Sequence, residues 1–412
     1  MRIAWIGPQP LAGGGVPQLA GVMLRALAER GVEIDAFMAT GGLETMPLDH
    51  PGIQATAVPI AWDATGQDGR SPAARFLSGQ RARAQAQQRL AATLAEHHAT
   101  RSYDVVYQFS QFELVGLRRH RSVLPPVVVH PETHAAGELR WLLRERDLAW
   151  RSGSRAAWGA AATMLATRAV VQRRDARAVD ALIAPSRIFA EHLRRDYGLR
   201  PEALHVVPNC IDLTQFNASG PAGGRAGPVR ILFVSRMAVR KGVDLVVALS
   251  HRLADLEGQV ELEAIGNHAL WSDYRPLLGD LHSGIGRYRP HVAPAELARL
   301  YREADLLVQP SRFEPFALTV AEALACGVPV VASDEVGACE DVAEGCCTTF
   351  PDGDLDAFEA AVRLAVARAR GERAGAVAAL ARSEAERLFS PSAVAERLHL
   401  VLERAARPRG PA

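Results

Sequence analysis

Cysteine, lysine and long apolar runs are scarce in this sequence, and each scarcity excludes a class of protein. Five cysteines in 412 residues, two of them adjacent at Cys346 and Cys347, provide neither a disulfide framework nor the paired spacing of a zinc site. No apolar run reaches the roughly 18 residues that a membrane-spanning helix needs, and the first apolar run is too short for a signal peptide. We therefore expect a chain that works in a reducing cytoplasm.

Lysine is nearly absent: Lys241 is the only lysine among 47 basic residues. An ammonium group is a compact point charge, whereas a guanidinium group is a broad, forked one. A single lysine among arginines suggests a position where the compact charge is needed, although chance survival of one lysine explains it equally simply.

The charge is almost balanced, at +1 overall, so nothing in the composition calls for nucleic acid. Residues 1–200 are nevertheless basic, with 25 Arg against 18 Asp and Glu. A basic half suits an acidic partner or peripheral contact with a membrane surface. We favour the plainer interpretation, a solvated arginine-rich face.

Strand and helix patterns alternate along the chain in two series. Apolar strands at 2–6 and 32–39 flank a helix at 16–30, and the pattern restarts at 229–234, after a segment rich in glycine and proline. Such alternation predicts two α/β units with parallel sheets. An amphipathic helix at 391–405 ends the chain, and we expect it to cross back to the first unit.

The first strand is followed by Gly13, Gly14 and Gly15, a turn that lets the backbone approach a phosphate or a sugar. The dinucleotide fingerprint is not met, because Gln18 stands where a third small residue belongs. A plain tight turn is the alternative interpretation.

Two histidines, His130 and His134, follow a strand at 126–130, where side chains reach a ligand. A structural role for either histidine is as plausible as a catalytic one. No third metal ligand has suitable spacing. The aspartates at 352, 354 and 356 fall at a helix start, where they are expected as caps, so we predict no metal site.

The segment 311–322 contains two carboxylates, Glu314 and Glu322, in a turn between a buried strand and a short helix. Open α/β sheets bind ligands at such turns, and a helix start offers free N–H groups to an anion. The two carboxylates can hold hydroxyl groups of a sugar and a ribose while the helix start holds a phosphate. Alternatively, both are ordinary turn and helix residues.

A second turn, 235–242, follows the first strand of the second unit and carries Arg236 and Lys241. A forked guanidinium and a compact ammonium together suit a diphosphate. Positive charges placed in advance stabilise the charge that develops on a departing nucleotide diphosphate. An ordinary basic turn is the alternative.

These motifs, with Pro208-Asn209 and Ile211-Asp212, resemble the retaining glycosyltransferases of family 4, which have the GT-B fold. The resemblance implies two Rossmann-like doubly wound domains facing a cleft, an acceptor domain at 1–215 to which 390–412 returns, and a donor domain at 216–389. It implies a nucleotide-sugar donor and no metal cofactor.

By position, the resemblance assigns Arg236 and Lys241 to the diphosphate, Glu314 to the sugar and Glu322 to the ribose. The remaining donor-binding candidates are backbone positions at Gly14, Gly15, Gly266, Phe316, Ala317, Leu318 and Thr319. The catalytic candidates are His134, His130, Glu314, Arg236 and Lys241, and the family's histidine corresponds to either His130 or His134.

Three departures concern the backbone: Ala317 and Cys210 each replace a usual glycine, and Val336-Gly337 replaces a glycine pair. If position 317 needs a positive φ, alanine would be strained there.

We predict a retaining, metal-independent hexosyltransferase, whose donor is a UDP-hexose or UDP-N-acetylhexosamine and whose acceptor is a hydroxyl of a natural product or glycan. With no evident nucleophilic carboxylate, same-face attack is favoured over double displacement. The alternatives are another GT-B enzyme (an inverting transferase or a sugar-nucleotide epimerase) and an inactive nucleotide-sugar binder.

Overall fold

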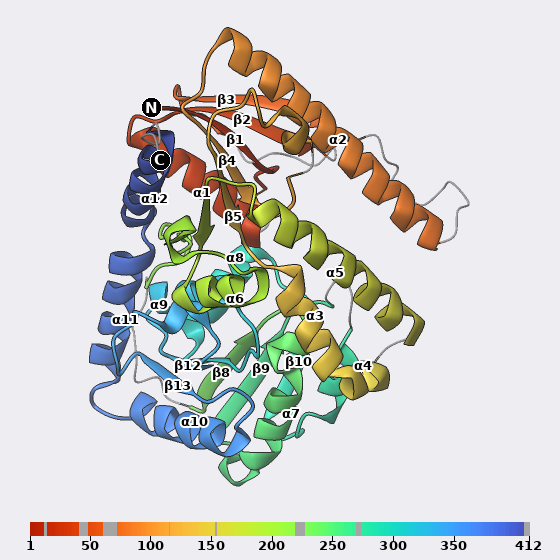
Figure 1. The fold of residues 1–412 in the computed structure, drawn as a ribbon. Coiled ribbons are helices and arrows are strands. Elements are labelled where there is room, and N and C mark those ends of the chain that lie inside the picture. The colour runs from red at the N-terminus through yellow and green to blue at the C-terminus, as the bar shows by residue number, and fades with distance from the viewer. Residues whose placement is uncertain are drawn as a thin grey trace.

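The computed structural model describes residues 1–11, 15–40, 48–60, 72–114, 116–152, 155–218, 227–268 and 273–407. Its strands form two sheets (Figure 1). The first contains Arg2–Pro8 (β1), Glu33–Thr40 (β2), Ile53–Pro59 (β3), Val105–Ser110 (β4), Val127–Pro131 (β5), Ala181–Ala184 (β6) and Leu204–Val206 (β7). The second contains Val229–Val234 (β8), Val260–Ile265 (β9), Gly286–Arg289 (β10), Leu306–Gln309 (β11), Val330–Ser333 (β12) and Cys347–Phe350 (β13).

Helices connect the strands and cover both sheets (Figure 1). In the first half they are Gly15–Glu29 (α1), Pro72–Thr100 (α2), Ala135–Arg144 (α3), Arg146–Ser152 (α4), Arg155–Ala176 (α5) and Arg187–Tyr197 (α6). In the second half they are Val243–Arg252 (α7), Pro294–Glu303 (α8), Leu318–Ala325 (α9), Leu355–Ala369 (α10), Ala374–Phe389 (α11) and Pro391–Ala406 (α12). None of the helices in the described ranges has the length and apolar character of a membrane span.

Both sheets are parallel and doubly wound, with strand orders β3-β2-β1-β4-β5-β6-β7 and β10-β9-β8-β11-β12-β13. In each sheet the order reverses at one pair, between β1 and β4 and between β8 and β11. Ligands bind in the crevice at the carboxyl ends of such a pair. The predicted fold of two Rossmann-like domains is confirmed.

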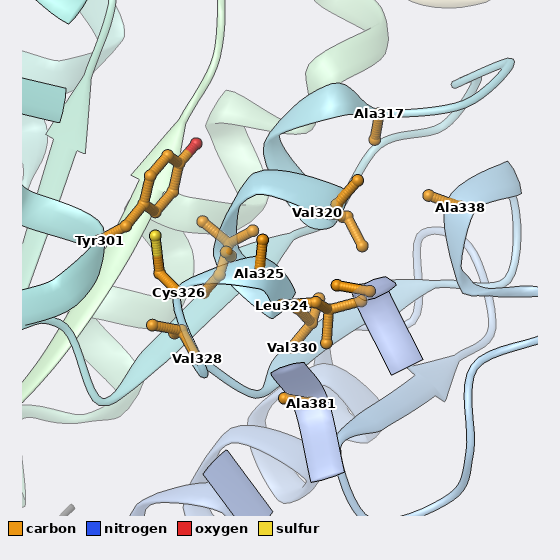
Figure 2. Close-up of a cluster of buried hydrophobic side chains, with 14 of the residues drawn as sticks. Tyr301, Ala317, Val320, Leu324, Ala325, Cys326, Val328, Val330, Ala338 and Ala381 are labelled. Atoms are coloured by element: carbon orange, nitrogen blue, oxygen red, sulfur yellow. The ribbon is translucent and has the colours of Figure 1, made fainter. Parts of the chain in front are cut away.

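The central strands are buried on both faces, as is usual in parallel sheets, whereas the edge strands β3, β7 and β10 are partly exposed. In β8, Ile231 and Phe233 pack with α7 and α10, whereas Leu232 and Val234 pack on the opposite face with α9 and α11. The two-residue side-chain period of a strand produces this division. Figure 2 shows the cluster around α9, whose small side chains allow the helix to lie close to the sheet.

Helix ends follow from local chemistry. The Ser186 hydroxyl accepts from the Phe189 amide at 3.1 Å and caps α6, which ends at Gly198 with a φ of 65°. Asp354 accepts from the Ala357 amide at 2.9 Å and caps α10. Both caps confirm the sequence interpretation of Ser186 and Asp354.

The last helix, α12, packs on the first sheet. Val394, Leu398 and Leu402 are fully buried in a cluster with Ile3 and Leu19. The C-terminal end of α12 therefore lies near the N-terminus (Figure 1), and the expected return of this helix to the first half is confirmed.

Candidate active site

The predicted site residues of the second half gather at the β8/β11 end. After β8 the chain forms a short 3-10 helix, Val239–Lys241, closed by Gly242 with a φ of 71°. A Cβ on Gly242 would collide with the carbonyl oxygen of Pro310, just beyond β11. Only glycine permits this approach, which brings Lys241 to the turn that contains Glu314.

The ammonium group of Lys241 forms an ion pair with the carboxylate of Glu314. Both side chains are buried, and Arg240 Nη1 lies 3.7 Å from the same carboxylate. Burial, and then the nearby Arg240 and Arg236, lower the pKa of Lys241 well below its usual range. An incoming anion would offset these effects and hold the lysine charged.

Arg236 is exposed at the same end of β8. Among the described residues its guanidinium has no ion-pair or hydrogen-bond partner. One cation of the predicted pair is therefore available to a ligand, and the other is held by Glu314.

Helix α9 begins at this edge. Ala317 precedes its first residue with a φ of 80°, in the left-handed region that alanine rarely adopts. Within the described part of the chain, the amides of Ala317, Leu318 and Thr319 have no hydrogen-bond partner, whereas that of Val320 donates to Ala317 O at 3.1 Å. The unpaired amides form a ready anion site. Phe316 is buried against Phe389, so only its backbone is available.

Glu322 lies one turn further along α9, and the buried Tyr301 hydroxyl donates to it at 3.0 Å. Burial raises the pKa of Glu322 to about 7. Its side chain lines a crevice of about 260 Å³ between the halves, and the other lining residues are Gly15, Gln18, Leu19, Val22, Cys210, Ile211, Asp212, Phe216 and Leu318. Glu322 and Gly15 thus face one space, while Gly14 lies outside the described residues.

Gly266 follows β9 with a φ of 143°, and a Cβ there would collide with the carbonyl oxygen of Ser235. This glycine lets two loops meet beside Arg236. The position agrees with donor binding, but close packing alone already requires a glycine.

Neither histidine reaches the cleft surface. His130 is fully buried in β5, with Nδ1 2.8 Å from the Tyr107 hydroxyl, and burial lowers its pKa to about 3. Its Nε2 lies 3.8 Å from Glu132, whose pKa burial raises to about 7. His130 is therefore neutral and is enclosed by protein.

His134 is also fully buried, with Nε2 2.6 Å from Asp196 Oδ2. Burial lowers the pKa of His134 despite this carboxylate. Three aromatic rings, those of Phe189, Tyr197 and Phe313, surround the imidazole edge-on at 5.3 to 5.5 Å. A catalytic role for either histidine stays a prediction, and burial does not favour it.

Two further residues near the site, Arg240 and Ser110, were not singled out from the sequence. Arg240 contacts both Glu314 and, at 3.8 Å, Glu138 of α3, so it joins the two halves at the site. The sequence feature that could have indicated Arg240 is its position next to Lys241 in a basic pair. Ser110, at the carboxyl end of β4, has a φ of 68° at the switch point of the first sheet. Strained backbone of this kind gathers at functional sites, but no sequence pattern announces it.

Among the described residues no group of three or more His, Cys, Asp or Glu side chains is placed to hold a metal ion. The positive charge at the site comes from Arg236, Arg240 and Lys241.

Two parallel, doubly wound sheets with facing switch points define the GT-B class of protein. Matches to two family models go further: "Glycosyltransferase Family 4" covers residues 13–215 and "Glycosyl transferases group 1" covers residues 228–367. The chain belongs to the family 4 glycosyltransferases.

The named relatives of this chain are also glycosyltransferases. A D-inositol 3-phosphate glycosyltransferase from Xylanimonas cellulosilytica is 32% identical over 78% of this chain and 75% of its own length. The enzyme of that name from Geodermatophilus obscurus is 29% identical over 89% of this chain and 81% of its own.

Solved structures share the fold. Sucrose-phosphate synthase from Thermosynechococcus elongatus superposes with a TM-score of 0.70 at 20% identity, over 98% of both chains. Anabaena HepE in complex with UDP-glucose superposes with a TM-score of 0.65 at 17% identity, over 98% of this chain and all of its own.

Proposed function

We propose that this glycosyltransferase moves a hexosyl group from a UDP-sugar to a hydroxyl group, with retention at the anomeric carbon and without a metal ion. The observation that carries the proposal is the conjunction of Arg236, the Lys241–Glu314 pair and the free amides of α9 at one switch point. Cations and amides suit a diphosphate, and a carboxylate suits sugar hydroxyls.

The diphosphate would take Lys241 from Glu314 and use Arg236 as its second cation. As the bond from the anomeric carbon to the leaving phosphate oxygen breaks, negative charge grows on that oxygen. Fixed cations and amides stabilise this charge without reorganisation, which is usually the largest contribution to catalysis. They would do the work that a metal does elsewhere.

Glu314, released from Lys241, would accept hydrogen bonds from sugar hydroxyls, and Glu322 would accept them from the ribose. Carboxylates accept such bonds with roughly twice the strength of neutral groups. Ala317 and Leu318 would present their amides to the phosphate beside them.

With both histidines enclosed, the leaving phosphate is the proposed acceptor of the incoming hydroxyl's proton. The acceptor then attacks on the face that the phosphate leaves, which retains the anomeric configuration. Isolation of a covalent glycosyl-enzyme would contradict this step.

For the acceptor we propose a sugar or polyol phosphate as the first class to test. The inositol-phosphate and sucrose-phosphate names of the relatives support that choice. Glycan and natural-product hydroxyls belong in the same panel, because the first-half loops near 8–16 and 63–80 lie partly outside the described residues.

The test measures UDP release from a panel of UDP-sugars and acceptors, with NMR assignment of the product's anomeric configuration. We expect Lys241→Ala to lose at least about 10²-fold in turnover, as removal of one transition-state charge partner does elsewhere. Arg370→Ala, an exposed arginine bonded to Gln259, is the control and should turn over normally. Undiminished turnover by Lys241→Ala, or none by the wild type with any pair, would refute the proposal.

A further inference from the structure

The segment 312–315, which carries Glu314, is held by the first half of the chain. Phe313 is fully buried in a hydrophobic cluster whose other members all belong to the first half, among them Phe37, Phe112 and Phe189. A side chain next to a donor-site residue thus lies in the core of the opposite domain.

A close cage surrounds the Phe313 ring. His134 lies 5.4 Å and His192 5.5 Å from it between ring centres, and the Arg240 guanidinium lies 5.8 Å from its centroid. On α3, Gly137 faces this cage so closely that a Cβ there would lie 2.6 Å from His134 Cε1 and 2.7 Å from the Phe313 ring. The cage therefore fits one position of the ring.

The neighbours of Phe313 are also held from the first half. Arg312 donates to Asp244 of its own half at 2.7 and 2.8 Å, and its Nε lies 3.3 Å from Glu145 of the first half. The Ser186 hydroxyl of the first half donates to the carbonyl oxygen of Pro315 at 2.7 Å. Arg240 donates to the carbonyl oxygen of Phe313 at 3.0 Å. Glu314 is thus flanked on both sides by residues that contact the first half, while its own backbone pairs within the second half, where its amide donates to Glu335 O at 3.3 Å and its carbonyl oxygen accepts from the Gly337 amide at 3.1 Å.

We propose that Phe313 is a positioning residue through which the first half sets the place of Glu314, with His134 as a wall of the cage. The inference rests on the proposed function of Glu314 as the acceptor of sugar hydroxyl hydrogen bonds. Donor recognition then has two parts. The cations and amides of the second half bind the diphosphate by themselves, whereas recognition of the sugar by Glu314 requires contact between the two domains.

Phe313→Leu tests this division, since leucine keeps an apolar side chain but cannot fill the cage. Calorimetric titration of the full chain with UDP and with the accepted UDP-sugar gives two dissociation constants. We expect the UDP-sugar Kd to rise about ten-fold, the loss expected from one charged hydrogen bond. The UDP Kd should stay within about two-fold of the wild type, a difference of less than 1 kcal/mol.

Phe112→Leu is the matched control, because Phe112 lies fully buried in the same cluster and its ring contacts Tyr197 rather than Phe313. It should leave both constants unchanged. If Phe313→Leu does not fold, Gly137→Ala displaces the ring from the other side and should give the same split.

Equal weakening of both ligands, no weakening of either, or the same split in Phe112→Leu would overturn the inference. Failure of the proposed donor site gives a different result, because the wild type itself would then bind neither UDP nor the sugar nucleotide.

Discussion

The ammonium group of Lys241 lies against the carboxylate of Glu314, 73 residues further along the chain. The lone lysine and one of the two motif carboxylates therefore neutralise each other before any ligand arrives. We propose that donor binding exchanges this pair for two others, lysine with diphosphate and carboxylate with sugar.

Removing the charge of the Glu314 carboxylate should affect the lysine–diphosphate contact and the carboxylate–sugar contact differently. We expect Glu314→Gln to bind UDP at least as well as the wild type, since Lys241 no longer has a competing partner. Turnover of the UDP-sugar should fall by about ten-fold or more, the effect of one lost charged hydrogen bond. Calorimetry and initial rates measure the two quantities, and Glu303→Gln, a half-buried carboxylate paired with Arg230 and Arg299, is the control. Weaker UDP binding would contradict the exchange.

Arginine should not replace the single lysine. The Lys241 side chain is only 12% exposed, and its pocket fits a compact ammonium beside Arg240. We expect Lys241→Arg to keep the charge and still lose most of the kcat/KM that Lys241→Ala loses, because a planar guanidinium needs more room. Initial rates of the wild type, Lys241→Ala and Lys241→Arg test this expectation. Near-normal activity of Lys241→Arg would show that the positive charge alone suffices.

Glu322 should make donor binding pH-dependent. Its pKa of about 7 in the fold exceeds the ordinary 4.5, so the folded chain holds this proton more tightly than the unfolded chain does. The contribution of Glu322 to the free energy of unfolding therefore falls as pH rises from about 4.5 to about 7 and is constant above that.

Donor affinity should change in the opposite sense, because only the ionised carboxylate accepts two ribose hydrogen bonds. We expect the donor KM to decrease as pH rises through about 7, and Glu322→Gln to abolish this change. Glu132, whose pKa is also raised to about 7, is the control: Glu132→Gln should keep the pH dependence. If Glu132→Gln instead loses the pH dependence of the donor KM, the titrating group is Glu132 rather than Glu322.

Ala317→Gly should stabilise the protein. Alanine at a φ of 80° costs about 1–2 kcal/mol, and the gain is partly offset by the greater freedom of glycine in the unfolded chain. We expect a net gain of about 0.5–1 kcal/mol in denaturant unfolding. Ala338→Gly, at a buried alanine nearby, should instead destabilise. No gain at 317 would mean that contacts of its methyl group, which belongs to the cluster in Figure 2, offset the strain.

Periodicity predicted the elements whose sequences are strongly apolar, such as β1, β8 and β11. It missed β3 and β10, at the outer edges of the two sheets, because Ile53–Pro59 and Gly286–Arg289 are partly exposed and carry no continuous apolar run. The helix α11 was missed because its sequence, rich in alanine and charge, gives only a weak pattern.

Local sequence motifs selected Glu314, Glu322, Arg236 and Lys241 as candidates, and the structure brings these four residues to the carboxyl ends of β8 and β11, while their roles stay predictions. What the sequence did not reveal is pairing at long range. The Lys241–Glu314 contact depends on the approach of Gly242 to Pro310. The burial of His130 depends on rings from β4, and that of His134 on rings from α6 and on Phe313 of the opposite domain.

The return of α12 to the first sheet means that the polypeptide crosses between the domains twice. A protease that cuts once between β7 and β8 would leave two fragments that still share a core, since Val394, Leu398 and Leu402 remain buried against Ile3 and Leu19. The two fragments should therefore stay associated and migrate together until the protein is denatured. Truncation before Pro391 would remove α12 and expose the core of the first domain, which is the domain more distant from this helix in sequence.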